Sequence, residues 1–301
     1  MKKVIVLYIC FLLVLLPISI ISCGGTPDVK PESSSTPTTP VTEQTTTTTT
    51  TTTTQPPEQQ PTLPPTQPES STPNYLEFLR CWKFSNLGEL SNSEPIAIVQ
   101  FLKDKEGVYD KDPYMGKPFI SYNLLVEGLP QDKVYDCWIK TIRTGKPTKP
   151  VSTGLKIDTS GYVTTESEKL GLALLDYAKG EAMEVLLMTE DKTITGYGIV
   201  IPYPIEARLG QCHVWVQCLT ANKDTFVIWG EGFEPNEDID VTGNSEGEIL
   251  KFTQKADSNG LLGPLVMLPA VIGKTSGSAT YTLVGKAGAL PVSFDWVSPT
   301  Q

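Results

Sequence analysis

Clusters of basic side chains are absent from this 301-residue chain. It has 24 lysines and arginines against 34 aspartates and glutamates, a formal net charge of -10, and the basic residues are scattered. Binding to DNA or RNA depends on neutralising phosphates with grouped lysine and arginine side chains. We therefore expect no nucleic-acid partner.

Recognisable catalytic motifs are also missing. The chain has one histidine, His213, and neither a G-x-S-x-G elbow, an H-E-x-x-H pair nor a phosphate-binding loop. His213 lies in the alternating segment 212–217, where we expect a solvent-facing or edge-strand position. Acidic residues are plentiful, but no spacing singles out a pair for hydrolysis. The sequence predicts a protein that is not an enzyme, with no catalytic residue and no cofactor.

Large apolar residues are almost absent from residues 24–74, which are mainly Thr, Pro, Ser, Gln and Glu and include an unbroken threonine run from Thr45 to Thr54. Such a segment cannot bury enough surface to offset its ordering entropy, so we predict a disordered linker. Its prolines favour extended conformations, and at about 3.1 Å per residue it would reach on the order of 150 Å. The tract resembles O-glycosylated stalks, and an unmodified linker is the alternative.

A long apolar run occurs only at the N-terminus. Lys2 and Lys3 precede the nearly unbroken apolar stretch 4–21, which is typical of a secretory signal over residues 1–22. The sequence Ile-Ile-Ser-Cys at 20–23 resembles the lipobox of bacterial lipoproteins. The resemblance implies acylation of Cys23 and attachment to a membrane through its acyl chains. An uncleaved transmembrane helix is the alternative, although the basic residues that usually follow such a helix are missing.

Cysteine is scarce, and its spacing argues against zinc because no C-x2-C pair occurs. Besides Cys10 in the signal and Cys23, the remaining cysteines are disulfide candidates: Cys81, Cys137, Cys212 and Cys218. Three pairings are possible. We favour Cys81 with Cys137 and Cys212 with Cys218. The second pair needs a bend, because a straight strand would separate the two by about 20 Å. Free buried thiols are the alternative.

Beyond residue 74, short apolar stretches alternate with turn residues. They predict strands at 96–102, 119–126, 183–188, 193–201, 213–218, 225–229, 281–284 and 292–297. Asn259-Gly260 predicts a type I′ hairpin turn. Residues 165–177 favour a short helical turn because they begin with a capping box, although alternating leucines there also fit a strand. Residues 74–82 are either a short helix or an irregular lead-in.

An internal repeat is the most informative pattern. Phe119–Pro130 and Thr225–Pro235 are both apolar strands that run into Glu-Gly, an apolar residue and, shortly after it, proline. Lys156–Gly161 and Lys255–Gly260 then share the pattern Lys-x-Asp-x-x-Gly. A Lys-Gly or Gly-Lys pair follows in each copy, so three landmarks recur in the same order.

The repeat predicts two domains after the linker of residues 23–74, at 75–205 and 206–301. The two prolines of Ile201–Ile205 are expected to restrict the angle between them. Each domain has about the size of an immunoglobulin-like (Ig-like) sandwich.

The second copy resembles the bacterial Ig-like modules of cell-envelope proteins, including the IPT type. The resemblance lies in Gly232–Glu237, Ala256–Gly260 and Gly277–Thr282, in this order. The first copy departs from it at Leu129-Pro130, so its assignment depends on the repeat. The predicted fold class is all-β, with two tandem Ig-like β-sandwich domains after a disordered Thr/Pro-rich linker.

Acidic groups offer possible calcium ligands in two places: Asp110 with Asp112, and Glu231, Glu234, Glu237, Asp238 and Asp240. Neither has the D-x-[DN]-x-[DN]-G spacing of a calcium loop, so we expect solvated acidic loops and no metal. Asp158 and Asp257 are expected to hydrogen-bond the backbone of their own turns.

Tryptophan occurs five times. We expect Trp229 and Trp296 in the core, and Trp82 and Trp138 against a disulfide because each adjoins a cysteine. Trp215 is a binding candidate.

Together these features predict an exported, lipid-anchored protein of the cell envelope, on its outer face or in the periplasm. Its expected role is non-catalytic, as a spacer, an adhesion module or a binder of another protein. The alternative is a glycan-binding protein, which requires two coplanar aromatic rings exposed on one face.

Overall fold

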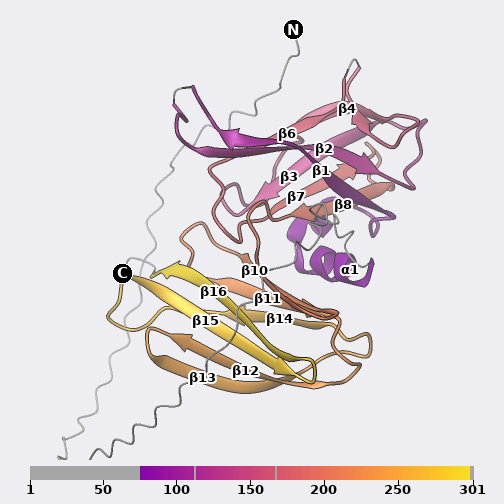
Figure 1. Ribbon diagram of the computed structural model, residues 1–301. Coiled ribbons are helices and arrows are strands. Elements are labelled where there is room, and N and C mark those ends of the chain that lie inside the picture. The colour runs from indigo at the N-terminus through magenta and orange to yellow at the C-terminus, as the bar shows by residue number, and fades with distance from the viewer. Residues whose placement is uncertain (1–74, 112, 167, 299–301) are drawn as a thin grey trace, which may run out of the picture. The chain divides into compact units, whose positions relative to one another are not determined.

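A computed structural model describes residues 75–111, 113–166 and 168–298 (Figure 1). The predicted signal at 1–22, the lipidation residue Cys23 and the linker 23–74 lie outside these residues. The described chain has one α-helix, one 3-10 helix and sixteen strands. The prediction of a mostly-β protein is therefore confirmed. In the part of the chain described, no helix has the length and apolarity needed to cross a membrane.

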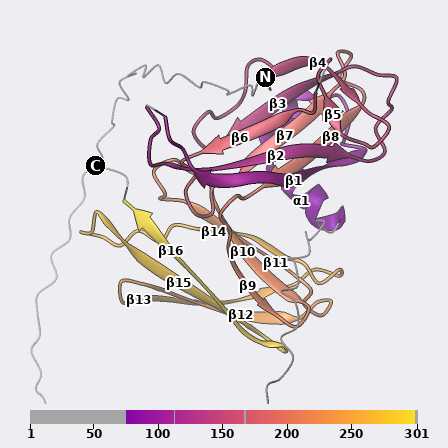
Figure 2. The same cartoon turned by 45° about the horizontal axis from the view of Figure 1, so that its top comes forward.

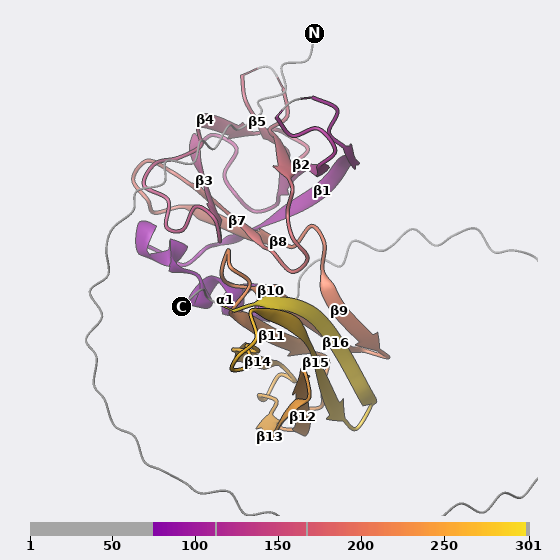
Figure 3. The ribbon, with the colours of Figure 1, turned by 90° about the vertical axis from the view of Figure 1, so that its left-hand side faces the viewer.

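Residues 97–200 form one eight-stranded sheet in the order β5-β4-β3-β7-β8-β1-β2-β6. Its strands are β1 (Ala97–Val108), β2 (Pro118–Val126), β3 (Tyr135–Thr141), β4 (Ser152–Ile157), β5 (Val163–Thr164), β6 (Gly171–Leu175), β7 (Met183–Met188) and β8 (Thr195–Val200). Figure 3 shows the sheet curling round on itself. The N–H of Val126 donates to the carbonyl of Gly161 at 2.8 Å, which joins β2 to the turn between β4 and β5. One face therefore encloses a core (Figure 2).

This first sheet differs from the two separate sheets of an Ig-like sandwich, and glycine explains part of the difference. β1 pairs with β8 only at Ala97 and Ile98 and then continues with β2 alone. It passes so close to β8 that a Cβ at Gly198 would overlap the carbonyl oxygen of Val99. A bulge between Lys103 and Lys105 bends β1 further. The sheet turns over continuously instead of splitting into two.

Residues 205–297 form two four-stranded sheets, ordered β14-β11-β10-β9 and β13-β12-β15-β16. The strands are β9 (Ile205–Leu209), β10 (Cys212–Cys218), β11 (Phe226–Glu231), β12 (Asp238–Ser245), β13 (Glu248–Lys255), β14 (Leu262–Met267), β15 (Ser276–Gly285) and β16 (Gly288–Val297). Side chains from both sheets share one core, so this unit is a β-sandwich (Figure 3). Ile205, at the border predicted between the domains, already packs in this core.

Helix α1 (Tyr75–Phe84) precedes the 3-10 helix η1 (Asn86–Leu90), so the ambiguous start of the domain is helical. Phe78, Cys81 and Trp82 pack on the outer face of the first sheet, against residues of β7 and β8. α1 lies beside β8 in Figure 1. Because α1 covers one face and the enclosed core the other, every residue of β7 is buried.

Two local predictions were wrong. Asn259-Gly260 does not form a type I′ hairpin, because only Gly260 has a positive φ and the flanking strands β13 and β14 belong to different sheets. The segment expected to be a helical turn contains β6, which pairs with β2. Leu172 and Leu174 point into the core from it, so the alternation outweighed the capping box.

The repeated landmarks have the same local structure in both units. Gly128 and Gly232 have φ values of 90° and 76°, and the apolar residue after each is buried in its core. Asp158 accepts hydrogen bonds from two backbone N–H groups of its turn at 2.8 and 2.9 Å, and Asp257 does the same at the same distances. The turn role predicted for both aspartates is confirmed.

Candidate functional site

A cluster of charged and aromatic side chains lies where α1 meets the outer face of β10 and β11. Glu77, Arg80 and Phe84 are spaced three and four residues apart on α1, so they share one face of the helix. This face adjoins the one that packs on the first sheet. α1 is therefore in contact with both β structures, through Phe78 and Trp82 on the first sheet and through Arg80 and Phe84 on Trp229.

Trp229 is the apolar centre of this cluster. The guanidinium of Arg80 lies 5.3 Å from the centroid of its ring, and the ring of Phe84 meets it edge-on at 5.3 Å. Arg80 also donates a hydrogen bond to the carbonyl of Gly263 at the start of β14. A cation over an indole face is attracted by the ring quadrupole, so Arg80 contributes both charge and packing here.

His213 lies between two acidic side chains. Its Nδ1 is 3.2 Å from Glu231 Oε1 and its Nε2 is 2.8 Å from Glu206 Oε2. The ring also stacks on Trp215 at 4.9 Å. The expected solvent-facing or edge-strand position was wrong, because β10 lies between β9 and β11 and the side chain is only 12% exposed. Glu231, directly opposite on β11, and Glu206, diagonally placed on β9, account for its place inside the sheet.

Glu77 completes the cluster through a hydrogen bond to Glu231. Burial, the charge of Glu231 and the hydrogen bond between the two carboxyls together raise the pKa of Glu77 to about 8, against the opposing charges of Arg80 and Arg208. The hydrogen bond from His213 lowers the pKa of Glu231. Two carboxyl groups share one hydrogen bond only when one of them carries a proton. That proton belongs to Glu77.

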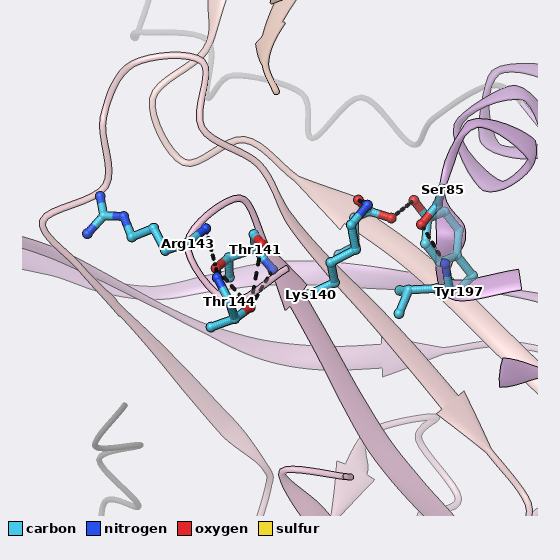
Figure 4. Close-up of polar contacts among 8 residues, drawn as sticks. Ser85, Lys140, Thr141, Arg143, Thr144 and Tyr197 are labelled. Atoms are coloured by element: carbon cyan, nitrogen blue, oxygen red, sulfur yellow. Dashed lines mark hydrogen bonds and ion pairs between the residues drawn. The ribbon is translucent and has the colours of Figure 1, made fainter. Parts of the chain in front are cut away.

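A second polar network lies beneath the C-terminal end of α1 (Figure 4). Glu184 accepts hydrogen bonds from Lys140 Nζ at 2.8 Å and from the Tyr197 hydroxyl at 3.0 Å. Ser85 is another hydrogen-bond partner of Tyr197. The Ser85 hydroxyl also accepts a hydrogen bond from the N–H of Leu87 and thereby caps the start of η1. Tyr197 is 0% exposed. The network therefore ties the helical lead-in to β3, β7 and β8.

The turn after β3 carries Arg143, whose side chain takes no part in the Lys140 network. Thr141 and Thr144 hydrogen-bond each other and the local backbone, and the side chain of Arg143 points away from the Lys140 network (Figure 4). Arg143 donates to Glu181 Oε2 and to the carbonyl of Asp176, both at 2.6 Å. Because the Glu181 side chain is 1% exposed, this pair is a structural contact beside the junction with β10.

The four described cysteines are all buried free thiols, so the favoured disulfides are not formed. Cys137 packs in the enclosed core of the first sheet, whereas Cys81 packs on its outer face under α1. Cys212 and Cys218 begin and end the regular strand β10, where six residues separate them by about 20 Å. A disulfide requires Cα atoms within about 7 Å. The alternative of free buried thiols matches the structure.

The tryptophans pack in protein interiors and contact no disulfide. Trp296 packs in the sandwich core as expected, whereas Trp229, also expected there, is buried on the outer face of its sheet, and Trp82 meets Tyr197 edge-on. Trp138 is partly buried beside α1, and Trp215 is buried against Trp229. Among these described residues, no two tryptophan rings form the exposed coplanar pair that glycan binding requires.

The acidic residues proposed as calcium ligands bind protein groups instead. Glu234 pairs with Lys286, Asp238 with Lys255, and Asp240 accepts from Thr253. Glu237 accepts from the backbone N–H groups of residues 234 and 286. No group of three metal-binding side chains occurs in the described parts of the chain, and Asp112 lies outside them.

One end of the second sandwich exposes four large aliphatic side chains, which we call the aliphatic end. They are Ile249 at 65%, Leu250 at 50%, Leu268 at 73% and Ile272 at 99% exposure. Ile249 and Leu250 begin β13, directly after its turn with β12. The loop that carries Leu268 and Ile272 is held beside that turn by hydrogen bonds and an ion pair.

Ser245 donates to the carbonyl of Pro269 at 2.6 Å, and Lys274 pairs with Glu246 at 2.7 Å. Glu246 also accepts from the N–H of Ser278 at 2.9 Å. The loop between β14 and β15 is therefore a fixed structure, and its apolar tip is exposed within it. Sequence reasoning overlooked this surface, although the adjacent pair Ile249-Leu250 breaks the alternation of β13 and was its one local signal.

Comparisons with known proteins add little to this picture. No known protein family and no curated protein matches the chain. A solved structure described as a tetra-tandem repeat in the extending region of a large adhesion protein is similar, with 12% identity and a TM-score of 0.22. The similarity covers 68% of this chain and 50% of that one, so the chain spans about half of its length. At this TM-score it carries no argument about fold or function.

Proposed function

We propose that this chain is a lipid-anchored protein of the bacterial cell envelope whose β structures form a non-catalytic head that binds another protein. The observation that carries the binding role is the aliphatic end. Exposing large apolar side chains forfeits roughly 25 cal/mol for each Å² left in water. Two lie on β13 and two on the fixed loop beside its turn, and together they mark a surface that a partner covers.

The chemistry of this surface favours a protein partner over a glycan. Its members are isoleucine and leucine, whereas sugars bind by stacking on aromatic rings. Aliphatic side chains instead pack against apolar side chains of another protein. β13 is also an edge strand, and its free backbone groups offer further contacts.

The polar clusters support a non-catalytic role. His213, Glu231 and Glu206 bind one another, and Glu184 and Glu181 are each paired with a cation. These contacts hold strands and helix together. These paired charged groups are accounted for by structural contacts, which favours a role carried by the surface.

Binding is tested by photo-crosslinking in the intact envelope. A photoreactive residue in place of Ile272 is expected to give a discrete protein adduct, and Leu268→Ser is expected to lower its yield by about tenfold or more, as for a central contact residue. The matched control carries the photoreactive residue at Val108, which is 66% exposed on the first sheet. An equal adduct from position 108, or none from 272, contradicts the proposal, and an adduct removed by glycan-cleaving but not by proteolytic treatment supports the glycan alternative.

The anchor is tested separately. Cys23→Ala is expected to abolish incorporation of labelled palmitate, because stable attachment through acyl chains requires the acylated thiol. Cys10→Ala, in the predicted signal, is the control and is expected to retain the label. Unchanged labelling in Cys23→Ala would exclude lipidation at this residue and leave plain secretion.

A further inference from the structure

We propose that Glu77, Glu231 and His213 form a proton-dependent latch that docks α1 on the second sandwich and releases it as the pH rises. The proposal is independent of the identity of any partner. It concerns the junction between the helix that follows the N-terminal segment and the sheet of β9, β10, β11 and β14.

The latch has a fixed side and a switchable side. Arg80 and Phe84 pack on Trp229 by contacts that need no proton, and Arg80 holds the carbonyl of Gly263. Glu77, one turn earlier on α1, meets a carboxyl group of β11. His213 Nδ1 lies 3.2 Å from Oε1 of that same carboxyl, and its hydrogen bond favours the ionised form of Glu231. Docking therefore places Glu77 where only its protonated form donates a hydrogen bond.

The charged groups around Glu77 come from every element packed there. Arg80 lies on its own helix and Arg208 on β9, and both favour its ionised form. Burial and Glu231 oppose that form and outweigh them. Asp257, in the turn before β14, and the buried thiol of Cys81 act on Arg80. Glu206 on β9 faces the latch through His213.

The direction of the pH effect follows from the pKa of Glu77, which docking raises from 4.5 to about 8. Docking therefore takes up a proton. The stabilisation of the docked state by this proton is fully present below the ordinary pKa of 4.5. It is lost as the pH rises through the raised pKa of about 8. In that window, each pH unit shifts the ratio of undocked to docked molecules by up to about tenfold.

The test measures the distance between spin labels at Lys83 on α1 and Ser258 in the turn before β14, both exposed, in the mature protein. At pH 5 we expect one narrow distance distribution, and a broad component that grows as the pH is raised to 9. Glu77→Gln keeps the amide donor without the titration, so its distribution is expected to stay narrow throughout. Glu94→Gln, an exposed acid outside the cluster, is expected to behave as the unmodified protein.

Glu231→Gln provides a second variant, because its amide can donate to an ionised Glu77. It is also expected to suppress the broad component at pH 9. Urea unfolding gives an independent readout, in which the midpoint of the unmodified protein falls from pH 5 to pH 9 and that of Glu77→Gln changes less. A broad component that grows equally in Glu77→Gln, or no change in the unmodified protein, overturns the latch. Failure of both glutamine variants to fold overturns it as well, since glutamine preserves the hydrogen bond.

Discussion

Gly232→Ala is expected to lower the free energy of unfolding of the second sandwich by about 3 kcal/mol or more. Gly232 has a φ of 76°, which alanine rarely adopts, and its added Cβ would overlap the carbonyl oxygen of Gln211. The strands on either side cannot move apart easily, because Phe233 next to it fills the core. Chemical denaturation followed by tryptophan fluorescence measures the loss.

The repeat supplies the matched control for this prediction. Gly128 occupies the equivalent turn with a φ of 90°, but an added Cβ would meet nothing within 4 Å. Gly128→Ala therefore carries only the conformational term, about 1 to 2 kcal/mol. Equal losses at the two glycines would mean that the close approach to Gln211 does not limit the turn.

These paired turns show which parts of the fold are accessible from sequence. A glycine with positive φ and an aspartate that binds its own turn are local requirements, so their order along the chain revealed the repeat. β7 was predicted with its observed bounds, since a strand buried on both faces is apolar at nearly every position, with Glu184 the one polar residue here. The capping box at 165–168 led to the wrong prediction of a helical turn. The N–H of Thr165 instead bonds the carbonyl of Glu168 between β5 and β6.

Strands with few apolar residues were missed. β12 contains aspartates, a glycine and an asparagine, and its buried positions alternate with exposed ones. β13 is an edge strand whose residues are mostly exposed, so no apolar face marks it. The pairing of both strands is decided by neighbours distant in sequence, and single-strand patterns do not contain that information.

The candidate site was hidden for a related reason. Glu77 and Glu231 belong to different halves of the chain, and neither stands in a motif that predicts the other. The disulfide prediction had the same weakness, because nothing in the sequence indicates that Cys81 and Cys137 lie on opposite faces of one sheet. A helix that contacts both β structures is a tertiary arrangement, and the sequence of residues 74–82 indicated only a short helix or an irregular lead-in.

Glu184→Leu is expected to lower the free energy of unfolding by about 3 kcal/mol. The substitution leaves the cation of Lys140 partly buried without its acid and deprives the buried Tyr197 hydroxyl of an acceptor. The loss also reaches α1, because Tyr197 packs against Phe78 and Trp82. Hydrogen exchange of the α1 amides is expected to rise with the loss measured by denaturation.

An exposed ion pair provides the control, because it tests the loss of a charge pair without the burial that Glu184 has. Glu106 pairs with Lys103 while both side chains are about half exposed, at 51% and 54%, so Glu106→Leu is expected to change stability by less than about 0.5 kcal/mol. Tyr197→Phe keeps the Lys140 pair and removes the hydrogen bonds of the hydroxyl with Glu184 and Ser85, with an expected loss of about 1 to 2 kcal/mol. A loss at Glu184 no larger than that at Glu106 would show that the packing of Phe78 and Trp82 alone holds α1 on the first sheet.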